Sequence, residues 1–283
     1  MGECDPSASK PINRKELTPM DHGKTLSVIT VTLNAERDLR LTAQSLIDLR
    51  QSKNIPEWIK IETALIDGGS LDETIAVATR SCAYDRIIIL AGSSIYEAMN
   101  HGAKICTGDY ITFLNAGDQY IAGRLEQLLL QAESLLLDET NNRALVAGML
   151  MQRNASGLTL LKPLRGRSPL SMPAYQPSLI YRREALISLP FDTSYRIVAD
   201  YIQMKLMIRH GYRITTYPLA ITVFAAAGVS SHPRRRLMEA HSAAEKYRFG
   251  NWLTRQLALF WLSRGLSLAW QIQDALKLRQ RFS

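Results

Sequence analysis

Several signals of common protein classes are missing from this sequence of 283 residues. No run of 18 or more apolar residues occurs, so no segment is typical of a transmembrane helix. The N-terminus also has no apolar core of a secretion signal. The three cysteines have no metal-binding spacing. Neither G-x-G-x-x-G after the first predicted strand nor the P-loop pattern G-x-x-x-x-G-K-[ST] is present, which weighs against a dinucleotide fold and a P-loop enzyme.

The net charge of +8 is concentrated near the C-terminus. Residues 231–283 hold ten Lys and Arg and three acids, so they contribute +7, and the rest of the chain is nearly neutral. A nucleic-acid-binding domain more often spreads positive charge over its body. The distribution therefore argues against a nucleic-acid partner and separates a neutral body from a basic tail.

Apolar, β-branched segments alternate with segments of helical periodicity in the first half of the chain. We expect strands at 25–33, 60–67, 86–90 and 109–114, and helices at 36–50, 71–81, 94–105 and 125–137. Ser70 or Asp72 is expected to cap the second helix. This alternation predicts an α/β fold with a mostly parallel sheet flanked by helices.

The pattern is looser after residue 143. We expect paired strands at 144–151 and 158–161, a short strand at 178–181, a helix at 199–209, and separate strands at 213–217 and 220–224. The resulting organisation is a loose N-terminal tail (1–24), one α/β domain (25–230) and a basic helical extension (231–283).

Polar residues follow the predicted strands, where ligands bind in an open parallel sheet. They are Thr32 and Asn34 near the end of the first strand, Asp67 at the end of the second, Asn115 and Asp118 after the fourth, and Asp200 in the first turn of a helix. Each motif alone has a purely structural explanation. Asp67 is a turn former before two glycines, residues 115–118 fit a type I turn, and Asp200 suits a helix N-terminus.

Five strings, taken in order, resemble the family 2 glycosyltransferases, which are inverting GT-A-type enzymes. They are SVITVTLN (27–34), LIDGGSLDET (65–74), IYEAMN (95–100), TGDYITFLNAGD (107–118) and FDTSYRIVADY (191–201). The resemblance is nearest to bacterial members that build exopolysaccharide, capsule and O-antigen, including the colanic acid type. It implies a GT-A-type, Rossmann-like fold and transfer of a sugar, with inversion, from a nucleotide sugar to an acceptor hydroxyl.

The resemblance also implies a role for each residue. Asp67 would contact the base and ribose of the donor, together with donor-side Thr32, Asn34, Asn100 and Asn115. Asp118 would hold Mg²⁺ or Mn²⁺, which prefer oxygen ligands. Asp200 would be the general base, and Gln176 would lie on the acceptor side. The implied donor is a UDP-sugar, and the implied acceptor is a saccharide or a lipid-linked saccharide.

The sequence departs from the family pattern in three places. Asn115 replaces the first Asp of the metal motif, residues 92–94 (GSS) replace an Asp-Lys/Arg-Gly run, and Tyr175 replaces the His of a His-Gln pair. A catalytically silent relative, acting as a binding or scaffold subunit of a polysaccharide assembly, is therefore the alternative. A sugar-nucleotide pyrophosphorylase is disfavoured, because no Gly-rich loop with Arg and Lys follows the first strand.

Residues 252–273 are apolar with a polar stripe at helical spacing and contain three of the four tryptophans. Together with the basic charge, this indicates a helix lying on an anionic membrane surface. The alternative is a helix packed on the catalytic domain or in a homodimer. We expect a cytoplasmic protein that binds peripherally to the inner face of the cytoplasmic membrane.

Overall fold

The computed structural model describes residues 23–141, 143–154, 157–161, 172–225 and 233–249. The chain divides into two compact units, and the smaller one contains helix α7 (Pro233–Lys246). The predicted helix at 252–273 lies outside the described residues, as does most of the predicted N-terminal tail. Lys24, which we assigned to that tail, is the first residue of a strand.

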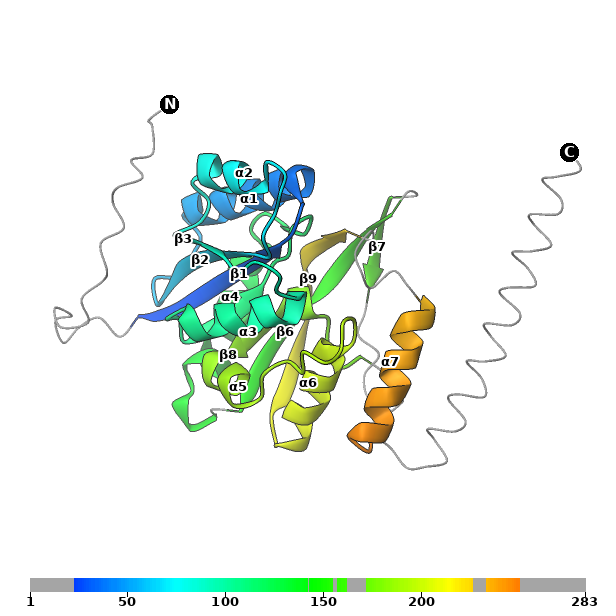
Figure 1. Cartoon of the computed structure of the whole chain (residues 1–283). Helices are drawn as coiled ribbons and strands as arrows, with labels where there is room; N and C mark the ends of the chain where they lie inside the picture. The colour runs from blue at the N-terminus through cyan, green and yellow to red at the C-terminus, as the bar shows by residue number, and fades with distance from the viewer. Residues whose placement is uncertain (1–22, 142, 155–156, 162–171, 226–232, 250–283) are drawn as a thin grey trace, which may run out of the picture. The chain divides into compact units, whose positions relative to one another are not determined.

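The first half of the larger unit alternates strands and helices as predicted (Figure 1). Its elements are β1 (Lys24–Thr32), α1 (Glu36–Gln51), β2 (Ile59–Asp67), α2 (Thr74–Ser81), β3 (Arg86–Ile89), α3 (Ile95–Ile105), β4 (Tyr110–Phe113), β5 (Gln119–Tyr120) and α4 (Arg124–Leu137). Strands β3, β2, β1 and β4 lie side by side in that order, and all three of these pairs are parallel.

The second half extends the same sheet. Its elements are η1 (Glu139–Asn141), β6 (Ala144–Asn154), β7 (Gly157–Leu161), η2 (Gln176–Ser178), β8 (Leu179–Arg182), α5 (Arg183–Ser188), α6 (Ala199–Arg209) and β9 (Arg213–Ala225). β8 pairs with β4 and with β6 in antiparallel fashion, and β9 pairs parallel to β6. β6 and β7 form the pair of strands that the sequence predicted, and the pair is antiparallel. The complete sheet is therefore mixed: β3, β2, β1 and β4 are all parallel, and the strands of the second half pair in both directions.

Alternation of side chains along the parallel strands explains why helices cover both faces. Val28 and Leu65 belong to a core cluster that also contains buried residues of α1, α2 and α4. The next residues along these strands, Ile29 and Ile66, lie against Gly102 of α3. Because neighbouring residues of a strand point to opposite faces, α3 packs on the face opposite α1, α2 and α4. Burial on both faces accounts for the continuous apolar runs of the sequence.

Two predicted boundaries were wrong. The strands expected at 213–217 and 220–224 form one continuous strand, β9, although Pro218 lies within it. The pairing of β6 with β9 shifts register on either side of Met149, and this irregularity accommodates a residue that has no N–H to donate. Helix α2 begins at Thr74 instead of residue 71, with Glu73 at its N-cap, because residues 70–72 are bonded to another loop.

The smaller unit contains α7, whose end packs locally. Ala243 and Ala244 are buried, and the rings of Tyr247 and Phe249 stack with their centroids 5.6 Å apart. Among the described helices of the protein, none is long and apolar enough to cross a membrane.

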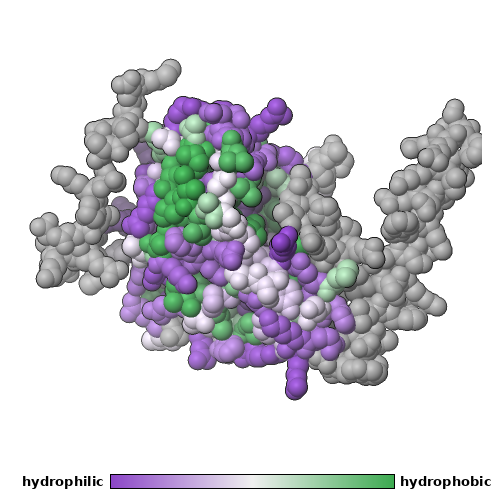
Figure 2. Space-filling model, viewed as in Figure 1, coloured by the Kyte–Doolittle hydropathy of each residue, from purple (hydrophilic) through white to green (hydrophobic). Residues whose placement is uncertain are grey.

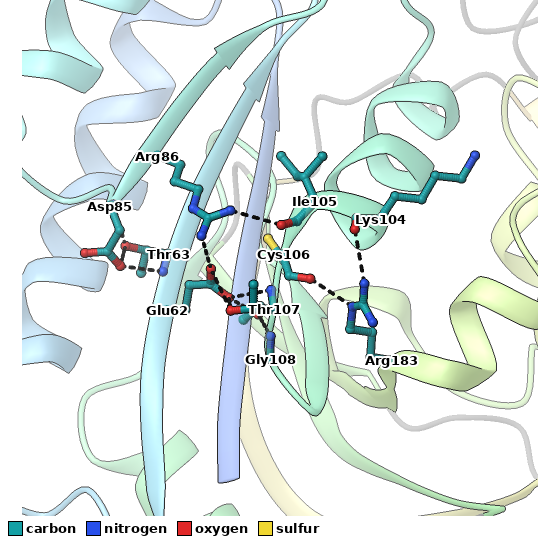
Figure 3. Close-up of polar contacts among 11 residues, drawn as sticks. Glu62, Thr63, Asp85, Arg86, Lys104, Ile105, Cys106, Thr107, Gly108 and Arg183 are labelled. Carbon is teal, nitrogen blue, oxygen red and sulfur yellow. Dashed lines mark hydrogen bonds and ion pairs between the residues drawn. The ribbon is translucent and has the colours of Figure 1, made fainter. Parts of the chain in front are cut away.

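A partly buried polar network ties the parallel strands together. Figure 3 shows Glu62 of β2 between Arg86 of β3 and the residues that precede β4. The Glu62 carboxylate accepts a hydrogen bond from Ser27 Oγ of β1 at 2.5 Å, and Ser27 Oγ in turn accepts one from the Gly108 N–H at 3.1 Å. A Cβ atom on Gly108 would contact Ser27 Oγ and would lie 2.9 Å from the Thr25 carbonyl oxygen.

We therefore predict that Gly108→Ala lowers the free energy of unfolding by about 2–3 kcal/mol, because the added methyl group overpacks a rigid backbone contact. Gly123→Ala is the matched control. Its φ is 70° but nothing lies within 4 Å of the added Cβ, so it should cost only about 1 kcal/mol. Urea unfolding of the two variants measures the difference, and equal losses would contradict the packing argument.

Candidate active site

The carboxyl ends of β1, β2 and β4 meet at one edge of the sheet. Thr32 and Asp67 are paired at the ends of β1 and β2. Beyond β4, the N–H groups of Leu114 and Ala116 donate to the carbonyls of Ile29 and Val31 of β1. The polar residues that follow these three strands are therefore brought together, as the topology predicted.

Loops after β1 and β2 are joined by reciprocal hydrogen bonds. The Asn34 N–H donates to Ser70 Oγ at 2.8 Å, and Asn34 Oδ1 accepts from the Leu71 N–H at 2.9 Å. Asn34 adopts a left-handed backbone conformation with φ 49°, which asparagine tolerates better than most residues. Asn34 therefore holds this edge in shape, and its predicted contact with a donor stays a prediction.

Asp67 is fully buried, and its carboxylate is bonded within its own turn. Its Oδ2 accepts from the N–H groups of Gly69 and Ser70, and its Oδ1 accepts from Ser70 Oγ at 2.5 Å. These bonds match the turn-forming explanation of the sequence. A direct bond to a nucleotide stays a prediction. Beside it, Thr32 Oγ1 is buried without a hydrogen-bond partner among the described residues.

The turn after β4 is held by a residue that we did not predict from the sequence. Thr42 Oγ1, on α1, donates to the Asp118 carbonyl at 2.7 Å and accepts from the Gly117 N–H at 2.9 Å. Asp118 Oδ1 accepts from the Ala225 N–H, at the end of β9, at 3.0 Å. Helix α1 therefore holds the backbone of this turn, and the end of β9 holds the Asp118 side chain.

Asp118 is only 2% exposed, and burial raises the pKa of its carboxyl to about 7. The nearby charge of Asp38 raises this pKa further, whereas backbone hydrogen bonds lower it. Asp38 was also missed by the sequence analysis. It lies in the first turn of α1, and β1–β4 pairing brings that turn to the end of β4.

Two oxygen atoms at this turn have no hydrogen-bond partner among the described residues. They are Asp118 Oδ2 and Asn115 Oδ1, and both are buried. In the described ranges no group of three or more His, Cys, Asp and Glu could hold a metal ion. A magnesium ion at a nucleotide site commonly takes only one or two protein oxygens, together with phosphates and water. These two oxygens therefore fit a divalent ion shared with a diphosphate.

Asp200 lies in the first turn of α6 and is partly buried. Burial raises the pKa of its carboxyl to about 6. The Tyr201 N–H, 2.8 Å from Asp200 Oδ1, and the Tyr96 hydroxyl, 3.3 Å from the same atom, lower the pKa. A carboxylate that ionises just below neutral pH is suited to accept a proton from a hydroxyl group.

Asn100 and Gln176 are the two remaining predicted residues. The Asn100 side chain donates to the Phe191 carbonyl and accepts from the Phe191 N–H, both at 2.9 Å. Its observed bonds therefore hold a loop, and its predicted donor contact stays a prediction. Gln176, in η2, is 5% exposed, and its Nε2 has no partner within the described ranges. Its assignment to the acceptor side is untested.

The parallel 3-2-1-4 strand order with oxygen-rich loops at the carboxyl edge is that of an open α/β sheet, in which ligands bind at this edge. Residues 27–139, less than half of the chain, match the family described as "Glycosyl transferase family 2".

Curated relatives include the uncharacterized glycosyltransferase YibD of Escherichia coli (strain K12), which is 28% identical over 116 residues, covering 40% of this chain and 32% of that protein. The PGL/p-HBAD biosynthesis glycosyltransferase of Mycobacterium bovis (strain BCG / Pasteur 1173P2) is 29% identical over 150 residues, covering 50% of this chain and 55% of that protein. The aligned region thus spans only about a third to a half of these relatives.

Solved structures share the fold. S. aureus TarS 1–349 in complex with UDP-GlcNAc has a TM-score of 0.58 at 17% identity, covering 78% of this chain and 65% of that one. The mannosyltransferase PcManGT from Pyrobaculum calidifontis, in complex with GDP-Man and Mn²⁺, has a TM-score of 0.59 at 18% identity, covering 83% and 68%. These similarities confirm the predicted GT-A-type fold.

We predict that Asp118→Asn stabilises the metal-free protein in a pH-dependent way. Because burial holds the pKa of Asp118 in the folded state at about 7, above the ordinary value of 3.8, folding takes up a proton between these values. The free energy of unfolding of the wild type therefore falls as pH rises through that range, and the asparagine variant escapes this loss. From about pH 4 to about pH 8 the variant should gain about 2–4 kcal/mol relative to wild type.

Chemical unfolding in EDTA, repeated across this range, measures the gain. Asp48→Asn is the control, because it makes the same substitution at an exposed position of α1, away from this turn. Parallel profiles for Asp118→Asn and wild type would show that folding does not raise the pKa of Asp118.

Proposed function

We propose that this chain transfers a sugar from a nucleotide-sugar donor to a hydroxyl group of a saccharide acceptor, with inversion at the anomeric carbon. The observation that carries the proposal is the carboxylate of Asp200. It is partly buried, has a pKa of about 6, and belongs to a chain of which residues 27–139 match glycosyl transferase family 2.

Asp200 acts as the general base. Its carboxylate takes the proton of the acceptor hydroxyl while the acceptor oxygen forms a bond to the anomeric carbon. The bond between that carbon and the nucleoside diphosphate breaks at the same time, and its electron pair leaves with the diphosphate. Attack from the side opposite the leaving group inverts the carbon, so a single carboxylate base suffices.

The donor lies at the carboxyl edge of the sheet, which has two chemically different sides. Figure 2 shows an apolar area over β2 and β3. Exposed apolar side chains near the ends of these strands include Leu71 and Ile89, which are 95% and 59% exposed. We place the base and ribose on this side, near Thr32 and Asp67, and the diphosphate near Asn115 and Asp118. A UDP-sugar is the proposed donor, and one structural neighbour was solved with UDP-GlcNAc.

A divalent ion, Mg²⁺ or Mn²⁺, is the proposed cofactor. Asp118 Oδ2 and Asn115 Oδ1 would hold it, since both are oxygen atoms without a partner among the described residues. The ion would supply Lewis-acid neutralisation of the charge that develops on the leaving diphosphate. One structural neighbour, PcManGT, was solved with Mn²⁺.

We further propose that the acceptor is lipid-linked and that the product belongs to a surface polysaccharide. The support is the basic, tryptophan-bearing segment of residues 231–283, whose composition suits the inner face of the cytoplasmic membrane. An acceptor anchored in that membrane would then be within reach of the active site.

We predict that Asp200→Asn lowers kcat for sugar transfer by about 10²–10⁴-fold while the KM for the donor stays near that of wild type. Asparagine is nearly the same size as aspartate but does not accept a proton at neutral pH. The assay is transfer from UDP-sugars to a saccharide or lipid-linked acceptor in the presence of Mn²⁺.

Asp192→Asn is the matched control for this test. Asp192 Oδ1 accepts from the Ser194 N–H and Ser194 Oγ, which is a turn role, so its loss should leave most of the turnover. If Asp192→Asn is inactive and Asp200→Asn retains wild-type turnover, Asp200 is not the base.

Membrane binding gives a separate prediction. Replacing Arg264, Lys277, Arg279 and Arg281 by Gln should weaken binding to anionic vesicles about 10³-fold, since each cation near such a surface contributes about 1 kcal/mol. Flotation with anionic and with neutral vesicles measures the effect. Equal flotation of wild type and variant on anionic vesicles would rule out electrostatic binding through this segment.

A further inference from the structure

Helix α3 contacts both ends of the loop that leads to Asp200. Tyr96 and Asn100 are four residues apart on α3, so they lie on the same face of the helix. Asn100 binds the beginning of the loop, through its two hydrogen bonds with the Phe191 backbone. Tyr96 binds the end of the loop, because its hydroxyl donates to the Ile197 carbonyl at 2.8 Å.

The Tyr96 side chain makes two further contacts in this region. Its ring lies against the ring of Phe191, with a centroid distance of 5.4 Å. Its hydroxyl oxygen is 3.3 Å from Asp200 Oδ1. A phenol has a single O–H proton, so the proton is shared between the Ile197 carbonyl and the Asp200 carboxylate. The shorter bond fixes the ring, and the longer one keeps the hydroxyl beside the carboxylate.

The start of α6 needs this outside support. Val198 occupies the N-cap position, and no side chain caps the helix there. Ile197 and Asp200 flank that position, so a residue that binds both of them fixes the first turn of the helix from outside. Tyr96 does so from an element about one hundred residues earlier in the chain.

We propose that Tyr96 and Asn100 are positioning residues, which hold the segment from Phe191 to Asp200 so that the Asp200 carboxylate keeps one orientation toward the acceptor. This inference rests on the proposed role of Asp200 as the base. Neither residue needs to contact the substrate. Two residues of the string IYEAMN, Tyr96 and Asn100, thus hold the proposed base in position.

The groups around Asp200 in the described structure are tyrosines instead of cations. Tyr96 faces it from α3 and Tyr181 from β8, and Tyr201 follows it on α6. Lys205 lies over the ring of Tyr201, 5.6 Å from its centroid. Burial raises the pKa of Tyr181 well above its ordinary value, as does the charge of Asp200, so this phenol stays neutral. The Tyr96 hydroxyl is accordingly the side chain that hydrogen-bonds the ionised carboxylate.

The test is Tyr96→Phe, which keeps the ring and removes the hydroxyl. The carboxyl carbon of Asp200 is titrated by NMR in protein labelled at aspartate, and the signal is assigned by its loss in Asp200→Asn. Removing a donor to the ionised form raises a carboxyl pKa, so the Asp200 titration should move up by about half a pH unit to one pH unit. With acceptor present, kcat should fall about tenfold at neutral pH. The acid limb of the pH profile of kcat should move up by about half a pH unit to one pH unit, as the Asp200 titration does. The KM for the donor should not change.

Tyr110→Phe is the matched control. It also removes a buried hydroxyl that donates to a carbonyl, that of Leu136, but at a site between β4 and α4. It should leave both the Asp200 titration and the pH profile of kcat at wild-type values. A general loss of stability would affect the two variants alike, whereas loss of positioning affects only Tyr96→Phe.

The outcomes separate the inference from the proposed function. If Asp200 titrates at the same pH in wild type and Tyr96→Phe, the inference is overturned, whether or not the wild type transfers sugar. An unchanged kcat in an active Tyr96→Phe enzyme also overturns it. If the titration shifts but the wild type transfers no sugar from any nucleotide sugar, the contact is supported and the proposed function fails by itself.

Discussion

The site depends on one constraint, the pairing of β1 with β2 on one side and with β4 on the other. Both pairs are parallel, so the three strands must end at the same edge of the sheet. Burial of β1 on both faces fixes its register, because a shift of one residue would exchange the side chains that pack on the two faces of the sheet. The loops that carry Asn34, Asp67 and Asp118 are neighbours because of this pairing.

Most polar groups at that edge are satisfied by the loops themselves. Asp67 is bonded within its turn, and Asn34 and Ser70 join two loops. Among the exceptions are Thr32 Oγ1, Asn115 Oδ1 and Asp118 Oδ2, which are buried without a partner among the described residues. A buried polar atom without a hydrogen bond costs about 1–3 kcal/mol, which a ligand that bonds to it can recover. A rigid frame with three such atoms is the arrangement expected of a preformed binding site.

Two carboxyl groups have raised pKa values. Burial is the main cause for both, but their neighbouring groups differ. Burial raises the pKa of Asp118 to about 7 and that of Asp200 to about 6. Asp118 has the carboxylate of Asp38 nearby, which suits a site that gains a cation. Asp200 has tyrosine hydroxyls nearby, which suits a group that must gain and release a proton. Different neighbours thus fit two aspartates of one domain for two separate roles.

The sequence by itself determined the parallel half of the fold, since a doubly buried strand such as β1 needs a run of apolar residues and its flanking helices need a 3.6-residue period. It also determined which loops carry Asn34, Asp67 and Asp118, because strand ends can be located from the same pattern. Only the tertiary structure decided that Pro218 lies inside one continuous strand, that Asp38 lies near Asp118, and that Tyr96 lies beside Asp200. These facts depend on packing between elements far apart in the chain, and local periodicity carries no information about such contacts.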